Sequence, residues 1–283
     1  MNTIPQTEVF CRYEQNGYNF YGKVDNGIIY QLNNAPWLGG EKTGNSYSIS
    51  DVKLVYPSEP TKILGLVKAY KQSWKEKEPP KCVRWFLKPS SSAASDGDDI
   101  VLPIYLSEVK VECELTIIIG KEIKDADEHE AESAIFGYTV GNDIMGFDES
   151  FIKKTDDTEE YKDASLAAGL KVGDRFAPYG PFIHKDITWS DLDFTLTITN
   201  DKTGKNVTHK DNTSNLIYSP PKIVSDLSRV LTLNPSDVIM TGTSKSIVAS
   251  DGDIVSVEIA GLGKSTNKIV VHPATSAKKN ILP

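Results

Sequence analysis

The chain has 283 residues, of which 39% are hydrophobic and 25% charged, so it can bury a sizeable core as one large domain or one with a small companion. Its formal net charge of -8 argues against nucleic acid and anionic membranes as main partners. No run approaches the roughly 20 apolar residues of a membrane span, no basic-then-apolar leader opens the chain, and the three cysteines fit neither a disulfide framework nor a zinc site, so we expect a cytoplasmic protein.

The first predicted elements form a β-meander. The segments 9–15, 18–24 and 28–32 are separated by Asn16-Gly17 and by Asp25-Asn26-Gly27, and Asn-Gly accepts the positive φ that tight hairpin turns need. The segment 50–62 follows a polar stretch and contains two prolines, which indicates a linker. We therefore expect a small N-terminal β-domain over residues 1–60 and a second domain over residues 61–283.

Strands dominate the second domain as well. In the segment 193–200 the residues Phe194, Leu196 and Ile198 share one face, which is the period of a half-buried strand. Helical spacing and flanking prolines predict a helix within 220–235, and early acidic residues with Gly137 at the close predict another within 126–137. Further strands are expected at 114–120, 206–210, 236–243 and 253–261. The expected fold class is α+β and β-rich, with a few short helices.

The first chemical motif is VECELTIIIG, in which Glu112 and Glu114 lie two apart. In a strand both side chains leave the same face, and Cys113 points the other way. Two adjacent carboxylates repel each other unless a cation or a proton lies between them. Because an apolar run follows, we expect the pair at the mouth of a pocket, although an exposed pair on an edge strand has the same pattern.

The second motif is GYTVGNDIMGFD, in which Asp143 follows a strand-like run and lies among glycines that permit close backbone approach. Alone, such an aspartate is equally typical of a turn. Three carboxylates without a nearby His or Cys make a hard oxygen site, which favours Mg²⁺, Mn²⁺ or Ca²⁺ over Zn²⁺ or copper.

From about Lys62 to Val271 these motifs resemble the fumarylacetoacetate hydrolase (FAH) family, because several blocks occur in the family's order and GLG closes the domain. The blocks are FLKPSSS, VECELTIIIGK, GYTVGND, FAPYGPFI, DNTSNLIYS and SDVIMTGTS. The resemblance implies an FAH-type mixed β-sandwich roll, a homodimer, and Mg²⁺ or Mn²⁺ in the pocket. It also implies a small 2-oxo or β-diketo acid as substrate.

Carried over residue by residue, the resemblance implies that Glu112, Glu114 and Asp143 bind the metal. Lys171, upstream of FAPYGPFI, falls where the family keeps a catalytic lysine. Lys88, in the FLKP block, and Thr243, in Thr241-Gly242-Thr243, fall near the substrate, Thr243 where the family binds a carboxylate.

The chain departs from the family where the pattern G-x-N-Y-x-x-H-x-x-E is usual. Here the sequence is VKAYKQSWKE, so Tyr70 and Glu76 match, but Ser73 stands where the water-activating His is expected. We expect Glu76 to be catalytic and Tyr70 to contact the substrate. His209, before DNTS, where some relatives have Gln, is expected in the substrate site and is a candidate to compensate.

Two further departures follow the metal aspartate: Phe147 replaces a frequent Arg, and Ser150 a Gln. A 2-oxo acid that chelates the metal is activated toward an enolate, and a lysine beside a dication is expected to have a lowered pKa. Hydrolysis then needs a base for water, which the loss of His weakens, whereas decarboxylation and tautomerisation do not. Three hypotheses stay open: a C–C hydrolase or decarboxylase, a keto–enol tautomerase, and a non-catalytic binder.

Overall fold

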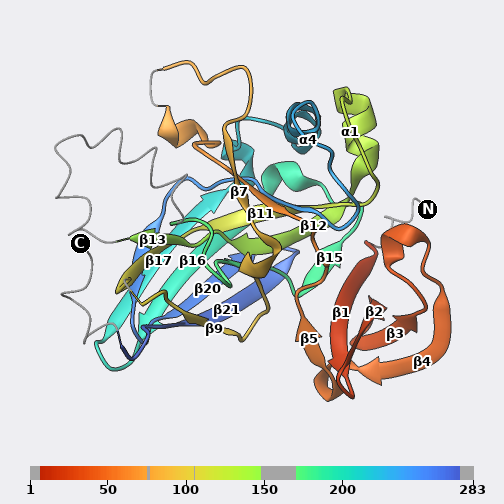
Figure 1. The fold of residues 1–283 in the computed structure, drawn as a ribbon, viewed down its shortest axis with the longest axis horizontal. Helices are drawn as coiled ribbons and strands as arrows, with labels where there is room; N and C mark the ends of the chain where they lie inside the picture. The colour runs from red at the N-terminus through yellow and green to blue at the C-terminus, as the bar shows by residue number, and fades with distance from the viewer. Residues whose placement is uncertain (1–6, 75–76, 105, 148–169, 275–283) are drawn as a thin grey trace.

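The structure is a computed structural model that describes residues 7–74, 77–104, 106–147 and 170–274 (Figure 1). Its largest element is an 11-stranded sheet that runs through the whole molecule. In spatial order it contains β4 (Lys42–Ser48), β3 (Ile28–Leu32), β2 (Tyr18–Asp25), β1 (Val9–Gln15), β15 (Phe182–His184), β12 (Ile135–Asn142), β11 (Cys113–Ile119), β18 (Val238–Met240), β6 (Ile63–Leu66) and β7 (Trp85–Lys88), with β5 (Lys53–Val55) paired to β1.

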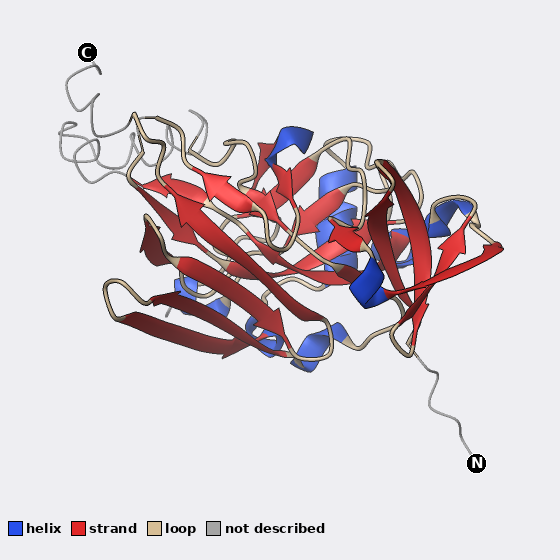
Figure 2. Cartoon of the chain, turned by 90° about the horizontal axis from the view of Figure 1, so that it is seen from below, coloured by secondary structure: helices blue, strands red, loops and turns tan. Residues whose placement is uncertain are grey.

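A five-stranded sheet packs on one face of this large sheet. It contains β17 (Lys205–Asn212), β16 (Asp193–Asn200), β20 (Ile254–Ile259), β21 (Gly263–Val270) and β9 (Asp99–Val101). Phe194, Leu196 and Ile198 are buried between the sheets together with Leu115 and Ile117, as the alternation in the sequence predicts. The α+β, β-rich class is thereby confirmed, and strands outweigh helices throughout the described residues (Figure 2).

The N-terminal meander is confirmed. The turns between its strands have positive φ at Asn16 (53°), Gly17 (81°), Asn26 (48°) and Gly27 (79°). The linker expected over 50–62 is partly wrong, because β5 lies within it and pairs with β1. Since β1 also pairs with β15, these strands extend the large sheet, at the lower right of Figure 1.

Two α-helices pack against each other at the top of Figure 1: α1 (Glu128–Ala134) and α4 (Pro220–Ser228). A capping box between Asp127 and Glu130 begins α1. The expectation that this helix runs to Gly137 is wrong, because it ends at Ala134 and Ile135 begins β12. β-Branched and aromatic residues there favour the strand. Among the described residues, no helix is long and apolar enough to cross a membrane.

Two small sheets complete the architecture and determine where the candidate site lies. One consists of β13 (Met145–Phe147), β10 (Glu108–Val111) and β19 (Ile247–Ser250), and the other of β14 (Ala177–Pro178) and β8 (Ala93–Ala94). The chain passes from β10 into β11 through Glu112, and from β12 into β13 through Asp143 and Ile144. The chain therefore passes between the three-stranded sheet and the large sheet twice, and the two connections lie side by side.

Candidate metal centre

The position of two acidic residues follows from the register of β11 and β12. Their last antiparallel pair is Cys113 with Asn142, so Glu112 and Asp143 are the next residues outward on the two strands. The Asp143 N–H donates to the Glu112 carbonyl at 3.0 Å, which fixes the two backbones side by side where they leave the sheet. A residue separation of 31 in the sequence thus becomes direct contact.

Glu114 lies one step inside the sheet and is fully buried. Its Oε2 accepts a hydrogen bond from the Gly242 N–H at 2.7 Å, while Oε1 is buried without a partner among the described residues. Gly242 has a φ of +88°, which favours glycine, and the preceding Thr241 is held by its N–H and hydroxyl on the Leu115 carbonyl at 3.0 and 2.9 Å. The loop after β18 thereby presents a backbone donor to the carboxylate.

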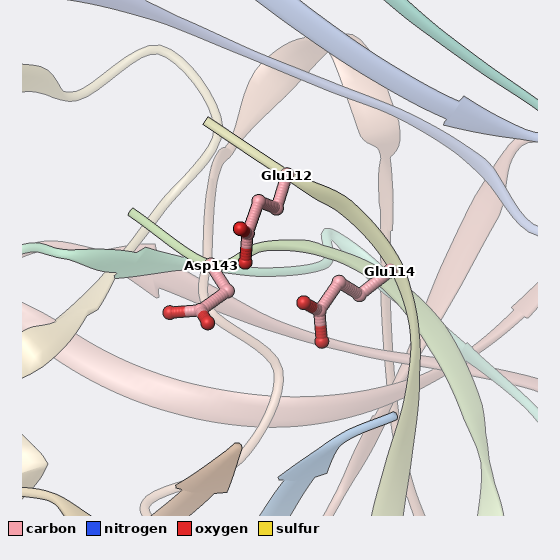
Figure 3. Close-up of side chains that lie close together, drawn as sticks. All are labelled: Glu112, Glu114 and Asp143. Carbon is pink, nitrogen blue, oxygen red and sulfur yellow. The ribbon is translucent and has the colours of Figure 1, made fainter. Parts of the chain in front are cut away.

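The three carboxylates converge. One oxygen from each of Glu112, Glu114 and Asp143 lies within 4.8 Å of the others, and Figure 3 shows the three side chains directed toward a common space. Cys113 is buried on the opposite face of β11, where its thiol approaches the Glu258 carbonyl at 3.8 Å. The strand geometry expected from the E-x-E spacing is thus what brings Glu112 and Glu114 to one site.

Two buried lysines meet the carboxylates. Lys171 Nζ donates to Glu112 Oε2 at 3.0 Å and also pairs with Asp143 Oδ2. Lys88 Nζ lies 2.8 Å from Asp143 Oδ1 and donates to the carbonyls of Ile144, Lys171 and Phe176 at 2.9, 2.6 and 3.0 Å. The hydrogen-bonding capacity of the Lys88 ammonium group is therefore fully used, and Lys88 holds the Asp143 carboxylate in position.

The electrostatics of the cluster are dominated by burial. Burial and the nearby Asp143 and Glu112 raise the pKa of Glu114 well above its ordinary value. Burial also opposes the charge on Asp143, but Lys171 and Lys88 outweigh it and lower the pKa of Asp143. Burial lowers the pKa of Lys88 to about 8 despite the attraction of Asp143.

The pKa of Lys171 is governed by its three carboxylate neighbours. Burial by itself lowers the pKa of Lys171, yet attraction to Asp143, Glu112 and Glu114 outweighs burial, so that the net shift is upward. The ammonium form is therefore the stable form here. The lowered pKa expected from a neighbouring dication is not a property of the carboxylate cluster itself.

The residues present fit a divalent cation. When all three carboxylates are ionised they face two ammonium groups, which leaves one excess negative charge, and Glu114 Oε1 lacks a partner among the described residues. Buried charge that is not compensated is costly. An all-oxygen donor set suits Mg²⁺, Mn²⁺ or Ca²⁺. Glu112, Glu114 and Asp143 are the residues that would hold the cation.

A pocket of about 230 Å³ opens over the cluster. Glu112 and Lys171 belong to its lining, together with the predicted Thr243 and with Ser73. The remaining lining residues are Leu66, Val67, Lys68, Phe86, Met145, Ser244, Lys245 and Ser246. Lys68 lies in the segment VKAYKQSWKE, in the position where the family pattern often has Arg. The sequence pattern missed Lys245, although its position two residues beyond Thr243 could have indicated it. A hydroxyl-rich, cationic lining suits a polar anion.

The other predicted site residues lie as follows. Tyr70 is fully buried, with its ring against Phe194 and its hydroxyl without a partner among the described residues. His209 contacts the pocket lining through Ser244. Glu76 and Ser150 lie outside the described residues, and Phe147 belongs to β13 by its backbone.

A β-rich fold with a buried acidic centre under a small polar pocket defines an enzyme-like class, and the comparisons identify it. The family profile described as "Fumarylacetoacetate (FAA) hydrolase C-terminal" matches residues 62–270, and one described as "Rv2993c-like, N-terminal" matches residues 10–57. The first match covers most of the chain. The protein belongs to the fumarylacetoacetate hydrolase family.

Relatives of known sequence and structure agree. Protein Rv2993c of Mycobacterium tuberculosis is 33% identical over 234 residues, 81% of this chain and 82% of the relative. The homoprotocatechuate catabolism bifunctional isomerase/decarboxylase of Escherichia coli is 32% identical over 209 residues, 73% of this chain and 45% of the relative. The structure of 2-hydroxyhepta-2,4-diene-1,7-dioate isomerase from Mycobacterium marinum superposes with a TM-score of 0.79 at 28% identity, covering 95% of this chain and 100% of that one. Two of these three relatives are thus named as enzymes.

Proposed function

We propose that this protein is a divalent-cation-dependent enzyme that forms the enolate of a small 2-oxo or β-diketo acid and cleaves a C–C bond, as a hydrolase or decarboxylase. The observation that carries the proposal is the convergence of Glu112, Glu114 and Asp143, with Lys171, beneath one pocket. A Mg²⁺ or Mn²⁺ ion held by the three carboxylates would supply Lewis-acid stabilisation of the charge that develops on the 2-oxo oxygen.

The chain's own residues perform the remaining tasks. Lys171 belongs to the pocket lining and is an ammonium group, so it stabilises the negative charge that develops on the substrate. Thr243 and Lys245 offer a hydroxyl and a cation to the substrate's carboxylate. Lys88 holds Asp143 and the Lys171 carbonyl in place, which keeps the carboxylate cluster preorganised. Tyr70 and Glu76 remain part of the proposed site.

A second candidate function uses the same pocket. Ser73, which lies in the pocket lining, cannot serve as the water-activating base expected there. The Mycobacterium marinum neighbour is named as an isomerase and the Escherichia coli relative as an isomerase/decarboxylase. A keto–enol tautomerase is therefore the alternative, and a non-catalytic binder of a chelated oxo acid is the third hypothesis.

The proposal also includes one feature that rests on the family resemblance and two that rest on the sequence alone. They are a homodimer, a cytoplasmic location, and the division of the chain into residues 1–60 and 61–283. Sedimentation of the purified protein tests the dimer, and expression of residues 61–283 alone tests whether the second unit folds by itself.

One experiment separates the candidate functions. Protein stripped with a chelator and reloaded with Mg²⁺ or Mn²⁺ is given oxaloacetate or an acylpyruvate, and loss of enol absorbance and release of pyruvate are followed. Lys171→Met should lower cleavage by about 10²-fold or more, whereas Lys264→Met, an exposed lysine on β21, should not change it. Hydrogen exchange at C3 without cleavage would identify a tautomerase. Binding without exchange or cleavage would leave only the non-catalytic binder.

A further inference from the structure

A histidine and a serine from distant segments meet at the wall of the pocket. His209 lies on β17, the edge strand of the five-stranded sheet, opposite Leu196 of β16. Its Nε2 is 3.0 Å from Ser244 Oγ, and Ser244 lines the same pocket as Glu112 and Lys171. The His209 imidazole is therefore one hydroxyl away from the space that the substrate would fill.

The local structure explains why this imidazole points inward. Neighbouring residues 206–208 and 210 of β17 are exposed, whereas His209 is half-buried and its ring packs edge-on against Phe194 at 6.3 Å between centroids. Alternation along the strand directs every second side chain toward the core, and His209 takes one of these positions. A purely solvated surface histidine would not have this packing.

The loop that carries Ser244 is tied to the acidic centre. Two residues upstream, the Gly242 N–H donates to Glu114 at 2.7 Å. The position of Ser244 is thus fixed relative to the carboxylate cluster by the Gly242 hydrogen bond, and relative to the five-stranded sheet by the contact with His209. The structure offers no other histidine contact to this pocket among the described residues.

The charges around His209 suit a proton acceptor. Burial lowers the pKa of His209, Asp211 on the same strand opposes that shift, and Lys245 from the pocket loop adds to it, so the net shift is downward. The Asp211 carboxylate is itself hydrogen-bonded by Gln72 and Asn215 at 3.0 and 2.6 Å. The imidazole is neutral at neutral pH and has a free electron pair to offer.

We propose that Ser244 and His209 form a proton relay at this pocket, which removes a proton from the carbon next to the 2-oxo group. The C–H bond next to the 2-oxo group breaks, its electron pair stays on the substrate as the enolate, and the proton goes to Ser244 Oγ. The hydroxyl proton of Ser244 passes at the same time to His209 Nε2. One proton has then moved from substrate to imidazole, and the reverse transfer completes the cycle.

This relay rests on the proposed function and deepens it, because Ser244 touches the substrate and His209 acts through Ser244. Its test is exchange of the C3 protons of pyruvate in D₂O, followed by proton NMR with Mg²⁺-loaded protein. His209→Gln keeps an amide nitrogen that can hydrogen-bond to Ser244 but cannot accept a proton near neutral pH. We expect about 10²-fold slower exchange in His209→Gln and in Ser244→Ala. Ser244→Thr, which keeps the hydroxyl, should restore most of the rate.

Two controls separate a relay from a structural clamp. Mg²⁺ and oxalate affinities, measured by calorimetry, should not change in either variant, and His129→Gln, an exposed histidine on α1, should exchange at the wild-type rate. The wild-type rate should rise with pH through the lowered pKa of His209, and His209→Gln should lose this dependence. Wild-type exchange that His209→Gln leaves unchanged would overturn the relay while the proposed function stands. A wild-type protein with neither exchange nor cleavage would overturn the proposed function itself.

Discussion

Glu114 offers the sharpest test of the acidic centre, because Glu114→Gln removes one charge and keeps the shape. The amide oxygen can still accept the hydrogen bond that Gly242 now donates at 2.7 Å. What is lost is one of three carboxylates whose oxygens lie within 4.8 Å of one another. The variant should therefore fold but bind a divalent cation poorly.

The size of the effect follows from linkage. At a cation concentration 100 times Kd, binding stabilises the folded protein by about 2.7 kcal/mol, which corresponds to a rise in Tm of about 5 °C for a chain of this size. Residues that only orient metal ligands typically cost about 10–100-fold in affinity when changed. Loss of a direct ligand should cost about 100-fold or more, which leaves a stabilisation of about 0.4 kcal/mol at the same concentration.

The assay is thermal unfolding of chelator-treated protein with and without Mg²⁺ or Mn²⁺. The wild-type Tm should rise by about 5 °C and the Glu114→Gln Tm by less than about 1 °C. Glu258→Gln, an exposed change on β20, should respond like the wild type. An equal rise in Glu114→Gln and wild type, or no rise in the wild type with any divalent cation, would refute the assignment of the centre.

The same variant should change the pH dependence of stability without a cation. The pKa of Glu114 is raised by burial and by its acidic neighbours, so the folded state favours the protonated carboxyl. Such a group makes folding less favourable as pH rises from the ordinary carboxyl value, about 4.3, toward the raised value. Between pH 5 and neutrality the cation-free wild type should lose more Tm than Glu114→Gln.

Three other substitutions test the supports of the centre. Lys88→Met leaves Asp143 and three carbonyls without their buried cation and should destabilise the protein by about 3–5 kcal/mol in denaturant unfolding; a loss under 1 kcal/mol would contradict the bracing role. Gly242→Ala changes a residue with a φ of +88° and should weaken cation binding, as measured by calorimetry. The control Gly261→Ala, at a similar φ of +79° but with open space around it, should weaken binding less. Asp237 is not part of the pocket lining, and Asp237→Asn removes the carboxylate that accepts hydrogen bonds from Thr61, Lys62 and Asn234. This variant should have a lower Tm but unchanged catalysis; altered kcat with unchanged Tm would contradict this.

Local patterns in the sequence predicted much of the fold, since turn chemistry and strand period act over a few residues. The Asn-Gly turns and the alternation in 193–200 are both observed. β5 was missed because its flanking prolines are also typical of a linker, and pairing with β1 is a long-range property. The predicted end of α1 is wrong because Ile135 pairs with Ile119 of β11 and begins β12. This pairing joins separate segments, so a local sequence pattern does not reveal it.

Some features of the candidate site could likewise be predicted from local patterns, and others could not. Strand period places Glu112 and Glu114 on one face, but only the register of β11 against β12 brings Asp143 to them. The sequence gives no access to the contacts of Lys88, because its carbonyl partners come from two segments far along the chain. The approach of His209 to Ser244 likewise joins residues 35 apart through the packing of two sheets.

The shared exit of β11 and β12 from the large sheet has a consequence for ion choice. The Asp143 N–H bond to the Glu112 carbonyl and the regular strand pairing next to it fix the separation of the two backbones, which limits how far their carboxylates can move apart. Mg²⁺ binds oxygen at about 2.0–2.1 Å and Ca²⁺ at about 2.3–2.6 Å with more ligands. A site whose backbone separation is fixed selects ions by their radius. Mg²⁺ should therefore bind in preference to Ca²⁺ even where Ca²⁺ is abundant.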